Sequence, residues 1–177
     1  MVEHIKVDKY NYETPFPVLK HIKYSDFEEI TFTFKMISTK ATRSQAAVIW
    51  IDNDFVGDVF VNDEKIKLPK KKWRKLVLWE KNGKIKFWAD SPCNDELKVK
   101  FVFKKGYVII CNGYDPMFEE EMQYKYCDVD DAILMIEPIS ENENIVKCKE
   151  MKGHGEFDDL VFYMKVELGK ETNPSNE

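Results

Sequence analysis

The chain has 177 residues, a net charge of −5 and 44% hydrophobic residues, of which the aromatic ones make up 14% of the chain. This composition is typical of a globular protein, and seven Gly and seven Pro are too few for a collagen-like or low-complexity chain. No stretch approaches the about 20 apolar residues that cross a membrane, and the N-terminus lacks the apolar region of a signal peptide. We therefore expect one cytoplasmic domain over residues 1–168, followed by a disordered tail over 169–177.

Charge is distributed unevenly along the chain. Residues 1–110 hold 21 basic and 15 acidic residues, about +6, whereas residues 111–177 hold 6 basic and 17 acidic residues, about −11. The asymmetry indicates either two surfaces with different partners or two faces of one domain that attract each other.

Alternating hydrophobicity dominates the chain from residue 30 onward. The segment Ile30–Met36 places Ile, Phe, Phe and Met on one face and Thr, Thr and Lys on the other, as a half-buried antiparallel strand does. The more continuous apolar run Ala46–Ile51 is typical of a central strand. Further strands are expected at 56–61, 65–68, 75–80, 84–88, 97–103, 107–111, 132–137, 144–148 and 160–166.

Turn residues separate these strands. Asn82-Gly83 favours the two positive-φ positions of a type I′ hairpin turn between 75–80 and 84–88, and Asn62-Asp63 is interpreted as a turn before 65–68, which Pro69 then ends. Gly113–Pro116 is also interpreted as a turn. Phe118, Met122 and Tyr126 form one apolar stripe at helical spacing, which predicts a short helix over 118–126. About eleven strands and at most one or two short helices predict an all-β antiparallel sandwich of jelly-roll or Greek-key type.

The ten residues Gly153–Phe162 carry the most distinctive local pattern, Gly-His-Gly-Glu-Phe-Asp-Asp-Leu-Val-Phe. They resemble the last strand of some bacterial β-sandwich domains of unknown function, in which a Gly and an acidic run precede Phe-Asn/Asp-Asp-Leu-Val-Phe. His154 and Gly155 depart from that pattern, since acidic residues stand there in those domains. The resemblance implies a strand that is entered through an acidic turn, and it implies no activity.

Acidic residues in two predicted turns form a candidate calcium site. Carboxylate oxygens are ligands that Ca²⁺ prefers, and it takes six to eight oxygens. The alternative is that acidic turns only keep strand ends hydrated. The candidate ligands are Glu156, Asp158, Asp159, Asp128 and Asp130.

Neither catalysis nor nucleic-acid binding is indicated. Cys148, His154 and Asp158 are near in sequence, but no nucleophile motif surrounds Cys148, which is more simply a small core residue. The basic run Lys65–Lys75 lacks any accompanying nucleic-acid signature in an acidic chain, and lysines in a loop also protect strand edges from aggregation. The cysteines contain no CxxC pair, so free thiols in a reducing compartment are preferred over zinc or disulfides.

Two functions are consistent with these residues. The first is a non-catalytic binding module, with carbohydrate as the expected ligand class, because sugars stack on exposed aromatic rings beside polar groups. Its candidate ligand-binding residues are Trp73, Tyr114 and Asp115. The second is an intracellular protein–protein interaction domain, such as an antagonist or immunity protein, that uses the acidic C-terminal third. Edge strands would also allow a homodimer.

Overall fold

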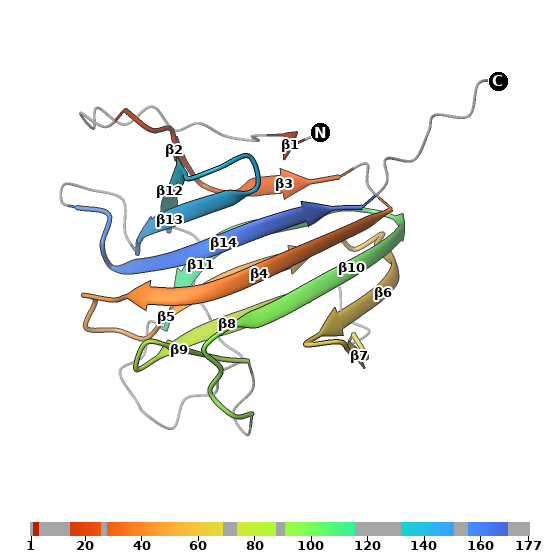
Figure 1. The fold of residues 1–177 in the computed structure, drawn as a ribbon, viewed down its shortest axis with the longest axis horizontal. Coiled ribbons are helices and arrows are strands. Elements are labelled where there is room, and N and C mark those ends of the chain that lie inside the picture. Colours follow the sequence, from red (N-terminus) through yellow and green to blue (C-terminus); the bar gives the residue numbers. More distant parts are fainter. Residues whose placement is uncertain are drawn as a thin grey trace.

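The computed structural model describes residues 2–3, 15–25, 28–68, 74–87, 91–115, 132–150 and 156–169. These residues form fourteen strands and no helix, in two antiparallel sheets packed face to face (Figure 1). The predicted all-β antiparallel sandwich is confirmed. Within the same ranges, no helix is long and apolar enough to span a membrane. The predicted helix over 118–126 lies outside the described residues.

The first sheet has six strands. Their spatial order is β1 (Val2–Glu3), β3 (Ile22–Tyr24), β11 (Val108–Tyr114), β5 (Gln45–Ile51), β8 (Arg74–Lys81) and β9 (Lys84–Lys86).

The second sheet has eight strands, and β14, β4 and β10 run side by side across the middle of it (Figure 1). Their spatial order is β2 (Val18–Leu19), β12 (Ile133–Pro138), β13 (Glu143–Lys149), β14 (Leu160–Leu168), β4 (Glu29–Ser38), β10 (Leu97–Lys105), β6 (Val56–Val61) and β7 (Glu64–Ile66). The chain crosses repeatedly from one sheet to the other, so neighbouring strands such as β4 and β14 are far apart in sequence.

The core lies between the sheets and is rich in phenylalanine. Alternation along β4 turns Phe32 and Phe34 inward, where both are fully buried. The ring of Phe32 lies 6.1 Å from that of Phe101 in β10, in an edge-to-face arrangement, and Phe34 lies 6.0 Å from Phe162 in β14. These rings join three strands that the sequence separates widely, and burying each of them contributes about 1.5–3 kcal/mol.

Strand β5 is buried on both faces. Ala47, Ile49 and Ile51 belong to the core between the sheets, while Ala46 and Val48 pack with Trp79 of β8 on the other face. This explains the continuous apolar run of β5 and confirms its prediction as a central strand.

Both predicted tight turns are confirmed by backbone geometry. Asn82 and Gly83 have φ values of 52° and 76°, and Asn62 and Asp63 have values of 48° and 67°. Two successive positive φ values define type I′ turns, whose twist matches that of the flanking strands. In the first turn the Glu80 carboxylate also accepts a hydrogen bond of 2.7 Å from the Gly83 amide.

Two features of the fold differ from the sequence interpretation. The predicted turn at Gly113–Pro116 is wrong for Gly113 and Tyr114, which extend β11 by pairing with Ala46 and Gln45 of β5. The strands β1, β2 and β3 were not predicted, because two or three residues are too few to show an alternating pattern. At the other end of the chain, Gly169 still donates a 2.7 Å hydrogen bond to Glu29, and residues 170–177 lie outside the described ranges.

Candidate functional site: a cavity at one end of the sandwich

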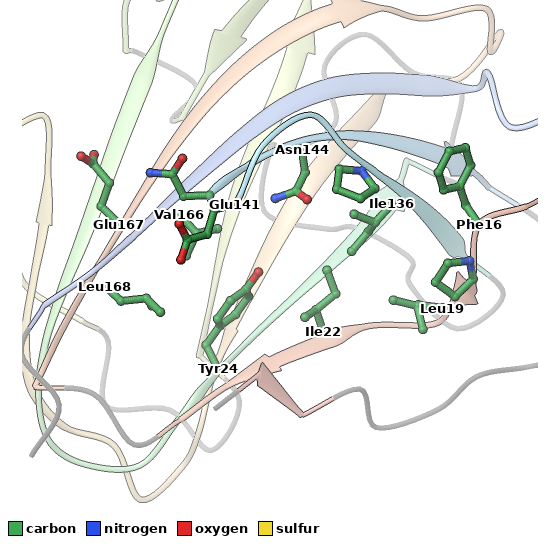
Figure 2. A pocket seen from close by; sticks show the side chains of 13 residues that line it. Phe16, Leu19, Ile22, Tyr24, Ile136, Glu141, Asn144, Val166, Glu167 and Leu168 are labelled. Carbon is green, nitrogen blue, oxygen red and sulfur yellow. The ribbon is translucent and has the colours of Figure 1, made fainter.

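A cavity of about 830 Å³ lies between β3 of the first sheet and the β12–β13 hairpin of the second. Figure 2 shows side chains from both sheets and from the chain before β2 directed into it. Its volume falls in the range of about 300–1,000 Å³ that is usual for small-molecule sites. The cavity is lined by Phe16, Pro17, Leu19, Ile22, Tyr24, Ile136, Pro138, Glu141, Asn142, Asn144, Val166, Glu167 and Leu168.

The cavity exists because the chain changes sheets at this edge. Strand β2 pairs with β12 in the second sheet, and β3 pairs with β11 in the first. Only Lys20 and His21 separate these strands, so the segment from Val18 to Tyr24 forms a corner between the sheets. The sheets are joined there by this corner.

The opposite wall is the β12–β13 hairpin, whose turn is held by several hydrogen bonds. The Ile139 amide donates to the Glu143 carbonyl at 2.8 Å. The Glu143 carboxylate accepts from Ser140 Oγ at 3.0 Å and from Tyr163 Oη at 2.5 Å. These donors lower the pKa of Glu143 below its ordinary value, because they stabilise the carboxylate form. The rim of the cavity is therefore a preformed turn.

The polar groups of the cavity lie toward one end of it. Figure 2 shows Phe16, Leu19, Ile22 and Ile136 toward one end, and the side chains of Glu141 and Glu167 toward the other. Tyr24 and Asn144 lie between these two groups, and both direct their polar atoms toward the middle of the cavity.

Tyr24 supplies the most unusual polar group of the lining. Its side chain is only 4% exposed, and its ring packs edge-to-face against Phe32 at 5.1 Å. No hydrogen bond joins its hydroxyl to any other described residue. Burial raises the pKa of Tyr24 well above its ordinary value, so the group stays a neutral phenol that is able to donate or accept a hydrogen bond. The hydroxyl of this largely buried side chain lies at the surface of the cavity without a hydrogen-bond partner among the described residues, and it is therefore a candidate ligand contact.

Among the described residues the lining contains no Lys, Arg or His, and two glutamates are its only charged residues. Glu167 is 3.1 Å from Lys165, which offsets its charge. Glu141 is an exposed residue of the hairpin turn. The cavity mouth is therefore neutral to negative.

The described site residues predicted from the sequence lie at the other end of the sandwich, where neighbouring strands are linked by several polar contacts. Asp159 Oδ2 accepts from the Glu150 amide at 2.9 Å, and the Glu150 carboxylate accepts from Gln45 Nε2 at 2.8 Å. The Asp115 amide donates to the Ser44 carbonyl at 3.0 Å. We call this region, with Lys40 and Asp158, the network end.

Tyr114 and Asp115 are buried at the network end. Tyr114 is 5% exposed, and the Arg43 guanidinium lies 5.4 Å from the centre of its ring. A ring covered in this way offers no open face for a sugar to stack on. Trp73, the third predicted ligand-binding residue, lies outside the described residues.

The candidate calcium ligands are only partly described. Glu156 is exposed, Asp158 Oδ2 forms a 2.6 Å ion pair with Lys40 Nζ, and Asp159 binds the Glu150 amide. No group of three His, Cys, Asp or Glu side chains in the described ranges is arranged to hold a metal ion. Asp128 and Asp130 lie outside those ranges, so a calcium site that includes them stays a prediction.

Cys148 is fully buried in the core between the sheets, as expected for a small core residue. Burial raises the pKa of its thiol well above the ordinary value, which suppresses the thiolate that nucleophilic catalysis needs. His154, the base in the hypothetical arrangement, lies outside the described residues.

The sequence interpretation missed the cavity because its residues show no local pattern. Tyr24 and Leu19 belong to a segment to which no element was assigned, and Asn144 was interpreted only as the start of a strand. The available signal was Pro138 followed by polar residues between two strands, which marks a turn but not a cavity.

Comparisons with known proteins add no relative. No family model matches the chain, and no curated protein or solved structure matches it significantly. The resemblance at Gly153–Phe162 therefore rests on those residues alone. In the structure Leu160 and Phe162 lie in the core, and Phe157 packs with Val18 and Ile133.

Proposed function

We propose that this protein is a non-catalytic binding module that holds a small molecule in the cavity between β3 and the β12–β13 hairpin. The observation that carries the proposal is the Tyr24 hydroxyl, which faces the cavity and has no hydrogen-bond partner among the described residues. A ligand that hydrogen-bonds this group gains a buried contact that the protein itself leaves unmade.

Binding is favoured over catalysis by the chemistry of the lining. The described lining residues include no Ser, Cys, His or Lys, the side chains that most often form a nucleophile and its neighbouring base. Tyr24 is a poor proton donor because its pKa is raised. Amide, phenol and carboxylate groups beside an apolar surface are the groups that recognise hydroxylated ligands, which keeps carbohydrate as the expected ligand class.

The cavity is favoured over the acidic C-terminal third as the binding surface. Asp158 and Asp159, two of the acidic residues that would meet a basic protein partner, are engaged within the chain by Lys40 and Glu150. Lys147 and Glu137 form another internal pair, at 2.5 Å. Of these contacts, Lys40–Asp158 joins the basic N-terminal part of the chain to the acidic C-terminal third, and the other two lie within that third.

A cytoplasmic location is part of the same proposal. Cys93, Cys111 and Cys148 are all free thiols, and free thiols persist in a reducing compartment.

The proposal is tested by titrating ¹⁵N-labelled protein with a panel of soluble sugars, alkyl glycosides, alkyl carboxylates and alkylammonium ions. A ligand of the cavity is expected to shift the backbone amide signals of Leu19, Tyr24 and Asn144. The amide of Asp95, in a loop that does not line the cavity, is expected to stay unchanged. If no compound shifts the cavity amides selectively, the protein does not bind small molecules there and the proposal fails.

A further inference from the structure

We infer that the cavity binds an uncharged amphiphile, a molecule with an aliphatic body and a hydroxylated head, of which an alkyl glycoside is the representative. This inference rests on the proposed function and specifies its ligand class.

The aliphatic body is indicated by the apolar end of the cavity. Phe16 and Ile136 are partly exposed there, and the fully buried Leu19 and Ile22 lie behind them in the core. Among the described lining residues at this end only Phe16 is aromatic, so a flexible chain is better matched than a stacked planar ring. Apolar surface in a ligand gains free energy in proportion to the area that these side chains remove from water.

The hydroxylated head is indicated by neutral polar groups in the middle of the cavity. The Tyr24 phenol both donates and accepts, and the Asn144 amide carries two donor hydrogens and one acceptor oxygen. No hydrogen bond joins the Asn144 side chain to any other described residue. Hydroxyl groups complement both side chains, because each hydroxyl also donates and accepts.

The charges of the cavity argue against an anionic head. Glu141 and Glu167 both lie at the polar end, and the described lining residues include no cation to oppose a carboxylate or phosphate. A cationic head would gain little, because Glu167 is already paired with Lys165 and Glu141 is exposed to water. An uncharged head therefore meets no unfavourable charge interaction at either end of the cavity.

The mouth of the cavity extends this amphipathic character. Among the described residues, only four large hydrophobic side chains are markedly exposed, and Leu168 and Ile139 are two of them. Leu168 lines the cavity, and Ile139 lies between the lining residues Pro138 and Glu141. This apolar surface lies beside Glu141 and Glu167 at the polar end, where it would contact the apolar face of a sugar head.

The experiment measures calorimetric affinities for three probes with the same eight-carbon chain, each below its micelle-forming concentration. The probes are octyl glucoside, octanoate and octyltrimethylammonium. Octyl glucoside is expected to bind at least about tenfold more tightly than either charged probe. Equal or tighter binding of octanoate overturns the inference, as does tightest binding of octyltrimethylammonium, which would assign the head to Glu141.

Two variants of the protein distinguish specific binding from nonspecific attraction of the octyl chain of the probe to apolar surface. Tyr24→Phe is expected to weaken octyl glucoside about fivefold to tenfold, the equivalent of one hydrogen bond, with an unchanged melting temperature because the hydroxyl has no protein partner. Asn144→Ala, a second variant, is expected to weaken it by a similar factor. The matched control is Tyr107→Phe, since Tyr107 does not line the cavity and only its ring is engaged, by Lys23.

The result also distinguishes this inference from the function on which it rests. If both variants bind octyl glucoside as the unmodified protein does, the inference is wrong. If octyl glucoside does not bind while another compound of the larger panel shifts the amide signals of the cavity residues, the ligand class is wrong but the binding function stands. If no compound shifts them, both are wrong.

Discussion

The two ends of the sandwich differ in whether their polar side chains are hydrogen-bonded within the protein. At the network end, β13 and β14 lead into groups that bond to one another: Thr39 Oγ1 donates to the Asp159 carbonyl at 2.6 Å, and the Asp159 amide donates to the Cys148 carbonyl at 3.1 Å. At the cavity end, Tyr24 of β3 and Asn144 of β13 have no partner for their side-chain polar atoms among the described residues.

The comparison separates polar residues that hold the fold from polar residues that are available to a ligand. Asp158 and Asp159 attract notice in the sequence because they form an acidic run, but their contacts with Lys40 and Glu150 give them a structural role. Tyr24 attracts no notice in the sequence, yet it combines burial with an unmade hydrogen bond. Unsatisfied groups beside a cavity are thus a better guide to a site than charge density is.

The network end is not perfectly satisfied. Gln45 Oε1 and Asn112 Oδ1 are buried without a partner among the described residues, although the amide nitrogens of both side chains are bonded, in the case of Asn112 to the Lys149 carbonyl at 3.1 Å. These oxygens are enclosed by protein and do not line the cavity.

The largest expected contrast is in thiol reactivity, which tests whether the interior beside the network end is closed. In a Cys127→Ser background, exposed Cys93 is expected to react with iodoacetamide at least about 100-fold faster than Cys111 and Cys148. Burial raises the pKa of Cys111 to about 12 and that of Cys148 well above its ordinary value. Time-resolved mass spectrometry measures the three rates. Rapid labelling of Cys148 in the native state would show that this end opens and would remove the contrast.

A matched pair of leucines tests the difference in packing. Leu160 and Leu19 are both fully buried, but only Leu19 lines the cavity. Leu160→Ala is expected to lower the free energy of unfolding by about 4 kcal/mol and Leu19→Ala by about 2 kcal/mol, because truncation beside an existing cavity breaks fewer contacts. Urea unfolding curves of both variants measure the difference. Equal losses would mean that the cavity end is packed as tightly as the rest.

The smallest expected effect concerns the hydrogen bond that holds the network end. Asp159→Ala removes the acceptor of the Glu150 amide and is expected to cost about 1–3 kcal/mol of unfolding free energy. The matched control is Asp95→Ala, since Asp95 is 87% exposed and pairs with Lys84 only at 3.4 Å. Thermal and urea unfolding are measured for both. If Asp159→Ala is as stable as the control, the network contributes nothing and the acidic turn is free for other roles.

The local structure of this protein was largely predictable from its sequence. Side chains alternate along a strand with a period of two, so the inward Phe32 and Phe34 of β4 could be identified without knowing what they pack against. Asn82-Gly83 fixes its own turn, because its backbone preference for positive φ depends on no distant contact. The short strands β2 and β3 could not be predicted in this way, since pairing with β12 and β11, far along the chain, holds them in place.

The sequence by itself determined the fold class, the long strands, the tight turns and the apolar composition of the core. Only the tertiary structure decided which polar groups have partners, because the contacts that satisfy or leave unsatisfied a side chain come from residues far away in sequence. Asp159 meets Thr39 from 120 positions away, and Tyr24 shares a cavity with Asn144 from another sheet. Composition and local pattern carry no information about contacts between residues so far apart in sequence. The candidate site could therefore be identified only from the arrangement of the two sheets.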